Sequence, residues 1–181
     1  MTIYFQLDQK DFLQHQLFIA SKSPAVIKQR RKSWIFITLV LAGFSVFFKL
    51  TGNVLLFYYC LFFAVITLLF YPLYLRRHYR KHYEKYIAEH YKNRVGNTVS
   101  ISFNDDNIET GDVSGNSRIN HSEVENITEI KDYIFLKLKT IGYMVIPKGK
   151  IDDMKALKER LLALSVQLKV PYIEEQDWQW K

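Results

Sequence analysis

The chain has 181 residues and a formal net charge of +7, with 25 lysines and arginines against 18 acidic residues. This length suffices for one domain of ordinary size with accessory segments and excludes two large hydrophobic cores. A single cysteine, Cys60, excludes an intrachain disulfide bond. The hydrophobic fraction of 49% is ordinary, but the apolar residues are concentrated in one third of the chain.

Residues 1–32 predict a short strand, a helix and a basic anchor. The stretch TIYFQL has the composition of a strand, Asp8 suits a helix N-cap, and Asp11 suits the first turn. The apolar stripe of this helix consists of Phe12, Leu13, Leu17 and Phe18, and SKSP ends it. The opening residues have neither a basic n-region nor a long apolar h-region, so we expect no secretory signal peptide. The segment is too small to fold alone and is expected to pack on the part of the chain that follows the two apolar runs described next.

Two apolar runs follow. Ser33–Phe48 carries no formal charge over 16 residues, and a second uncharged run extends from Leu50 to Leu75. A membrane-spanning helix needs about 20 apolar residues, and Lys49 extends the first run because its long stem lets the ammonium group reach the interface. The runs predict a transmembrane hairpin with helices at 33–49 and 54–75 and a short external loop at 50–53. A pair of buried core helices is the alternative, because periodicity alone does not separate the two.

Basic residues flank this hairpin on both outer sides. Cytoplasmic segments of membrane proteins carry an excess of lysine and arginine, so both termini are expected in the cytoplasm of a multi-pass protein of the cell inner membrane. Juxtamembrane lysines and arginines also attract anionic headgroups. The predicted membrane-anchoring and lipid-contacting residues are Lys28, Arg30, Arg31, Lys32, Arg76, Arg77, Arg80 and Lys81.

Residues 76–94 predict a basic juxtamembrane helix with aromatic residues at helical spacing. Nucleic acid attracts the same charges, so a membrane-tethered basic nucleic-acid-binding protein is the alternative function. Residues 95–181 are acidic, however, with 14 acidic and 11 basic residues, and nucleic acid is therefore not the expected partner. His78 and His82 have the i, i+4 spacing of a metal pair, but they lack an HExxH pattern, so we expect no metal or cofactor.

The C-terminal half predicts short strands and one helix. Strands are predicted in VSISF, IETGDV, RINHSEVENITEI and YIFLKLKTIGYMVIP. The turns between strands are NDDN, SGNS and residues 140–142. In YIFLKLK the apolar Ile134, Leu136 and Leu138 share one face, which is typical of a half-buried antiparallel strand. A helix should begin after Asp152 or Asp153 and bury one face, formed by Met154, Leu157, Leu161 and Leu164. The predicted fold class is thus a membrane α+β protein, a two-helix hairpin plus a small antiparallel sheet closed by a C-terminal helix.

This order of elements, with the motifs ISFNDDNIET, INHSEVENITEIKDYIFLKLK and YMVIPKGKIDDMKALKERL, resembles the YcxB-like family of bacterial membrane proteins. Where related sequences often place an aromatic residue after the proline-lysine step, this chain has Gly149, Lys150 and Ile151. The resemblance implies a pleckstrin-homology-like (PH-like) domain at 95–168. It implies no catalytic motif, and the biochemical role of the family is poorly defined.

We therefore expect a non-enzymatic interaction or regulatory module whose partner is a second protein or another copy of the chain. The tail, 169–181, carries Tyr172, Trp178 and Trp180, residues common at interfaces. Packing on its own domain and contact with a partner both remain open for this tail. An enzymatic or calcium-binding site is conceivable at one acidic group, which consists of Asp105, Asp106, Glu109 and Asp112. Its asparagine and glycine neighbours favour turns instead.

Overall fold

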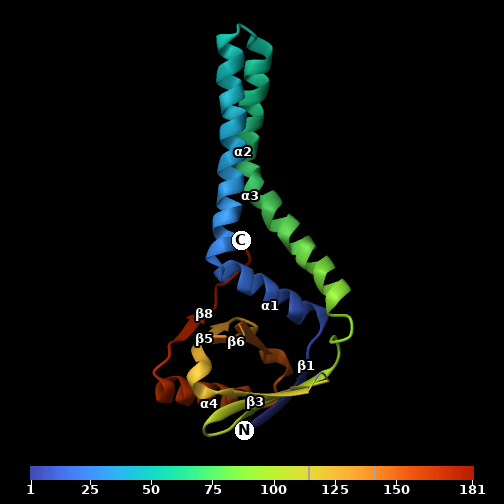
Figure 1. Cartoon of the computed structure of the whole chain (residues 1–181), viewed down its shortest axis with the longest axis vertical. Coiled ribbons are helices and arrows are strands. Elements are labelled where there is room, and N and C mark those ends of the chain that lie inside the picture. Colours follow the sequence, from blue (N-terminus) through green and yellow to red (C-terminus); the bar gives the residue numbers. More distant parts are fainter. Residues whose placement is uncertain (114, 141) are drawn as a thin grey trace. The chain divides into compact units, whose positions relative to one another are not determined.

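The computed structural model describes residues 1–113, 115–140 and 142–181 (Figure 1). Ser114, in the predicted turn SGNS, and Ile141, in the predicted turn 140–142, lie outside the described residues. The chain divides into two units. We call Met1–Gln16 with Glu84–Gln179 the sheet unit, and Leu17–Tyr83 with Trp180–Lys181 the helical unit.

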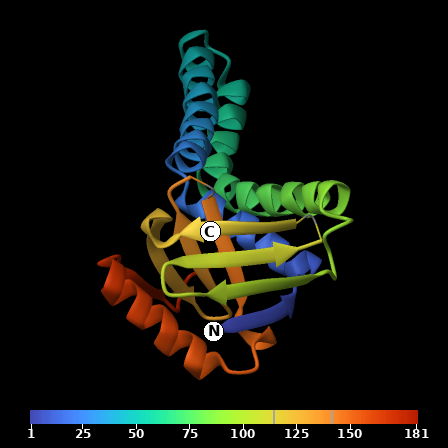
Figure 2. The same cartoon turned by 60° about the horizontal axis from the view of Figure 1, so that its bottom comes forward.

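The first sheet of the sheet unit has the order β1-β2-β3-β4, and all its strands are antiparallel (Figure 2). Its strands are β1 (Thr2–Gln6), β2 (Thr98–Phe103), β3 (Asn107–Asp112) and β4 (Gly115–Asn120). The register of β1 on β2 extends from Thr2 opposite Ser102 to Gln6 opposite Thr98. The N-terminal strand therefore belongs to the same sheet as strands that come after the two apolar helices.

The second sheet has the order β7-β6-β5-β8. Its strands are β5 (Val124–Ile130), β6 (Tyr133–Leu138), β7 (Gly142–Pro147) and β8 (Tyr172–Glu175), and β8 lies parallel to β5 while the other pairs are antiparallel. Short 3-10 turns, η1 (His121–Glu123) and η2 (Lys148–Lys150), precede β5 and follow β7. The segment interpreted as a tail thus contributes a strand to this sheet.

Strand β6 differs from the half-buried strand that its sequence predicts, because both of its faces are covered. Ile134 and Leu136 are buried as expected, but Tyr133 is only 6% exposed and Phe135 is fully buried. The first half of α1 (Gln9–Lys22) covers this second face. The His15 ring stacks on Phe135 with 6.4 Å between the ring centroids, and the Tyr133 hydroxyl donates to Asp11 Oδ1 at 3.0 Å.

The helices α1 and α4 both begin with polar caps. In α1, the Asp11 amide donates to Asp8 Oδ1 and the Asp8 amide donates to Asp11 Oδ2, a reciprocal pattern that satisfies two helix-terminal donors. In α4 (Met154–Leu168), Asp153 is the N-cap and accepts from the Ala156 amide at 2.9 Å. The face predicted to be apolar is buried at Leu157, Leu161 and Leu164 and half-buried at Met154.

The helical unit contains two long antiparallel helices joined by a turn at 51–53. They are α2 (Pro24–Leu50), capped by Ser23, and α3 (Val54–His90), whose last turns from Glu84 belong to the sheet unit. Gly52 has φ +79°, which suits glycine at this tight turn. Hydrogen bonds that connect the helices include Ser33 to Tyr71 at 2.9 Å, Trp34 Nε1 to Leu68 O at 3.2 Å, and Ser45 to Phe57 O at 3.3 Å.

Both helices extend beyond the membrane spans predicted at 33–49 and 54–75. The basic anchor before residue 33 is part of α2, because Ser23 and Pro24 supply a cap and a first-turn proline further upstream. The predicted juxtamembrane helix 76–94 continues α3 without a break and ends at His90, and Pro72 lies inside α3.

The apolar side chains of α2 and α3 are largely exposed, for example 81% at Leu50 and 81% at Leu55. Both helices are long and apolar enough to cross a membrane, and only 6% of the most apolar 18-residue window of each is buried. A core helix of a soluble protein would bury most of this window. The pair of buried core helices considered above is therefore not what the structure contains.

Candidate functional site

The eight predicted anchoring residues all lie in the helical unit, at the end of the two helices that is distant from the turn at 51–53. Four belong to α2 and four to α3. Seven of these side chains are exposed, and Arg30 is half-buried. The exposed members have the access to solvent that contact with a charged surface requires; they are Lys28, Arg31, Lys32, Arg76, Arg77, Arg80 and Lys81.

Arg30 contacts the end of the chain. Its guanidinium carbon lies 4.8 Å from the centroid of the Trp180 ring, and its Nη2 donates to the Lys181 carbonyl at 2.6 Å. Trp180 is 7% exposed, and its Nε1 donates to the Arg76 carbonyl at 3.0 Å. The tail thus packs Trp180 on its own chain, and Arg30 binds this indole where the sequence predicts a lipid contact.

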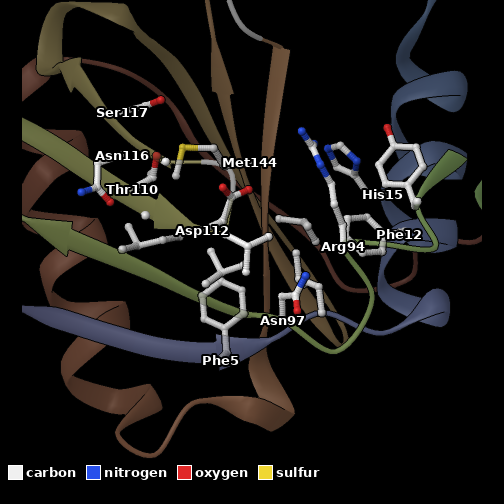
Figure 3. A pocket seen from close by; sticks show the side chains of 18 of the residues that line it. Phe5, Phe12, His15, Arg94, Asn97, Thr110, Asp112, Asn116, Ser117 and Met144 are labelled. Atoms are coloured by element: carbon white, nitrogen blue, oxygen red, sulfur yellow. The ribbon is translucent and has the colours of Figure 1, made fainter.

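The sheet unit contains a crevice of about 520 Å³ (Figure 3). It opens beside β4 and β7. Each of these is an edge strand of its sheet, and the two strands are not paired with one another. Its apolar walls come from β1, β2, β7, α1 and the segments next to them: Phe5, Leu7, Phe12, Val99, Ile101, Met144 and Val145.

Polar groups surround the opening of this crevice. Arg94 and Asn97 come from the loop after α3, and Asp112 comes from the end of β3. Arg94 is exposed, and none of the described carboxylates forms an ion pair with it. Neutral polar residues complete the opening at Thr110, Asn116 and Ser117 (Figure 3).

His15 lines the crevice from α1. Its Nε2 lies 2.7 Å from the Tyr143 carbonyl oxygen, and because a carbonyl only accepts, Nε2 must carry the proton. Burial lowers the pKa of His15 below its ordinary value, and the hydrogen bond to the carbonyl offsets only part of this effect. His15 is therefore neutral at pH 7, and it adds no positive charge to the crevice.

The sheet unit also contains two buried carboxylates, each held by partners. Glu129 accepts from Lys148 at 2.5 Å, from Lys158 at 2.9 Å and from the Tyr172 hydroxyl at 2.7 Å. Asp11 accepts from Lys150 Nζ at 2.5 Å in addition to its bond with Tyr133. These acids connect β5 with η2, α4 and β8, and α1 with η2 and β6, which is a structural use of their charge.

The other candidates from the sequence do not converge on a site. Asp105 lies in the turn between β2 and β3 and pairs with Arg160 at 3.7 Å, whereas Glu109 lies in β3 and pairs with Arg118 at 3.6 Å. His78 stacks on Tyr74 with 5.6 Å between the ring centroids. Within the described residues there is no group of three or more His, Cys, Asp or Glu side chains that could hold a metal ion.

Sequence reasoning missed the crevice. Phe5, His15, Arg94, Asp112 and Met144 come from five separate segments. No spacing rule connects them. The sequence singled out Asp112 only as a turn residue and placed Arg94 only at the end of a basic helix, so neither pointed to a crevice.

Part of the chain matches the model of a known protein family. Residues 103–160 match the family model described as YcxB-like protein, which confirms the resemblance for this segment. The match extends from the end of β2 into α4, so it includes Asp112 and Met144 and leaves Phe5, His15 and Arg94 outside. Comparisons with curated proteins and with solved structures found no match.

Proposed function

We propose that this chain is a multi-pass protein of the bacterial inner membrane. It is YcxB-like at residues 103–160 and carries two apolar helices. The helical unit spans the bilayer, and both termini lie in the cytoplasm. The sheet unit is a PH-like module that acts by binding and not by catalysis. Its two sheets with a C-terminal helix support the PH-like assignment.

The observation that carries this topology is the pairing of β1 with β2. β1 precedes the two apolar helices and β2 follows them, yet they are hydrogen-bonded over five residue pairs. If both helices span a bilayer, their outer ends return to one side, where the two strands are able to pair. The exposed basic residues near these ends support the cytoplasmic side.

A binding role for the sheet unit is supported by the chemistry of its side chains. Glu129 and Asp11, the buried carboxylates described above, already have lysine and tyrosine partners. The crevice, in contrast, is of the size and apolar character common for small-molecule sites. A tethered module also meets ligands of the membrane at a high effective concentration.

Cysteine labelling tests the topology. In a Cys60→Ser background, Asn53→Cys in the turn should react with a membrane-impermeant maleimide in intact spheroplasts. Val166→Cys, on the exposed surface of α4, is the matched control and should react only after the membranes are opened. Equal reactivity of both positions in intact spheroplasts would contradict the proposed topology.

Nucleic-acid binding is the second candidate, because the exposed basic residues of α3 also suit a phosphate backbone. Replacing Arg76, Arg77, Arg80 and Lys81 with glutamine separates the two functions. If the protein is a membrane protein with the proposed topology, labelling at residue 53 becomes weaker or the orientation becomes mixed, since half of the flanking charge is gone. If it binds nucleic acid, the topology is unchanged and co-purifying nucleic acid is lost.

A further inference from the structure

We propose that the crevice of the sheet unit binds a medium- or long-chain fatty acid, with the acyl chain between the sheets and the carboxylate at Arg94. The inference names the ligand class for the binding module and rests on the proposed function, because a bilayer next to the module is the source of the ligand. The argument uses the volume, the walls and the charges of the crevice.

The apolar walls suit an alkyl chain. A volume of about 520 Å³ lies within the range of about 300–1,000 Å³ that is usual for small-molecule sites. Phe5, Phe12 and Ile101 are themselves buried side chains, so part of the wall belongs to the packed interior of the sheet unit. An alkyl chain is favoured here because it makes no demand on hydrogen-bonding groups that these walls do not offer.

The charges at the opening select the headgroup. Arg94 is the one permanent cation among the described lining residues, since His15 is neutral. A guanidinium group binds a carboxylate through two parallel hydrogen bonds. Asp112 lines the same crevice (Figure 3), and a like charge there disfavours a doubly charged phosphate more than a singly charged carboxylate.

Methionine methyl groups provide the readout. The chain has three methionines, of which Met144 lines the crevice and Met1 and Met154 do not. The full chain, labelled with 13C-methyl methionine and held in nanodiscs, would be titrated with dodecanoate. We expect a saturable shift of the Met144 resonance, with Met1 and Met154 unchanged as internal controls for non-specific partitioning.

Variants test the headgroup assignment. Arg94→Gln should weaken dodecanoate binding roughly tenfold, because it removes a charge-assisted pair. The matched control, Arg118→Gln, changes an exposed arginine outside the crevice and should leave the affinity unchanged. Both positions are exposed, so neither change disturbs the core. Asp112→Asn should improve binding of dodecyl phosphate more than binding of dodecanoate.

Two outcomes would overturn the inference. One is the absence of a saturable Met144 shift. The other is equal binding of dodecanoate and dodecanol with no effect of Arg94→Gln, which would mean an apolar cavity without headgroup recognition. If residue 53 is labelled from outside as expected, either of these outcomes would reject the proposed ligand but not the topology. If instead residue 53 is protected in intact spheroplasts while Met144 shows the expected shift, the topology is rejected and the ligand is not.

Discussion

Replacing Phe135 with alanine is expected to lower the free energy of unfolding of the sheet unit by about 3–5 kcal/mol. Phe135 is fully buried at the centre of β6, between β5 and β7, and its ring packs on His15 and Tyr133. Truncation would leave a cavity that the strands on both sides prevent from collapsing. A loss of this size removes a large part of the stability of an ordinary domain.

Amide hydrogen exchange of β6, followed by mass spectrometry on the full chain, would report this loss as faster exchange. Val166→Ala is the control, because Val166 is 78% exposed on α4 and a surface change of this kind usually stays within about 0.5 kcal/mol. Unchanged protection of β6 in the Phe135 variant would show that the second face of this strand is not packed as described.

Replacing Glu129 with glutamine is expected to destabilise the sheet unit by about 3 kcal/mol at pH 7, the lower end of the range for a broken buried ion pair. The lower end applies because the partners Lys148 and Lys158 are partly exposed and regain some hydration. Glu125→Gln is the matched control. Glu125 also pairs with a lysine at 2.5 Å, but Glu125 itself is exposed, so the loss of this pair should cost less than about 1 kcal/mol.

The Glu129 effect should depend on pH in a defined direction. Burial raises the pKa of Glu129, but hydrogen bonds from Lys148, Lys158 and Tyr172 outweigh burial and lower it to about 2 from 4.5. A carboxyl group with a lowered pKa stabilises the fold fully above 4.5 and loses this contribution as the pH falls toward 2. The difference in midpoint temperature between the native chain and Glu129→Gln should therefore be smaller at pH 3 than at pH 7. An equal difference at both values would contradict the ionic role of Glu129.

Local patterns predicted the elements well. Uncharged runs identify the two apolar helices, and alternation between turn residues identifies β2, β3, β6 and β7, because these signals lie within about ten consecutive residues. The Asp8 cap and the buried face of α4 follow from the same kind of short-range rule. The α+β layout is thus readable from the sequence.

Features that depend on distant residues were not predictable. Tyr133 and Phe135 read as solvent-facing because α1, which covers them, comes more than a hundred residues earlier. Arg30 is predicted to contact lipid because no residue near it in the sequence indicates that it will pack on Trp180. The crevice collects its lining from both sheets, α1 and a loop, and its position depends on how the sheets are arranged rather than on any one segment.

The pairing of β1 with β2 also imposes an order on how the protein is made. Gln6 lies opposite Thr98, so the N-terminal strand emerges from the ribosome long before its partner. Thr98 follows Gln6 by 92 residues, which at about 5–20 residues per second take roughly 5–20 s to translate. During this interval both apolar helices are synthesised first, and β1 and the start of α1 wait unpaired. The sheet is able to close only after both flanks of the two helices have been made, and expression of residues 95–181 alone would produce a sheet that lacks its first strand.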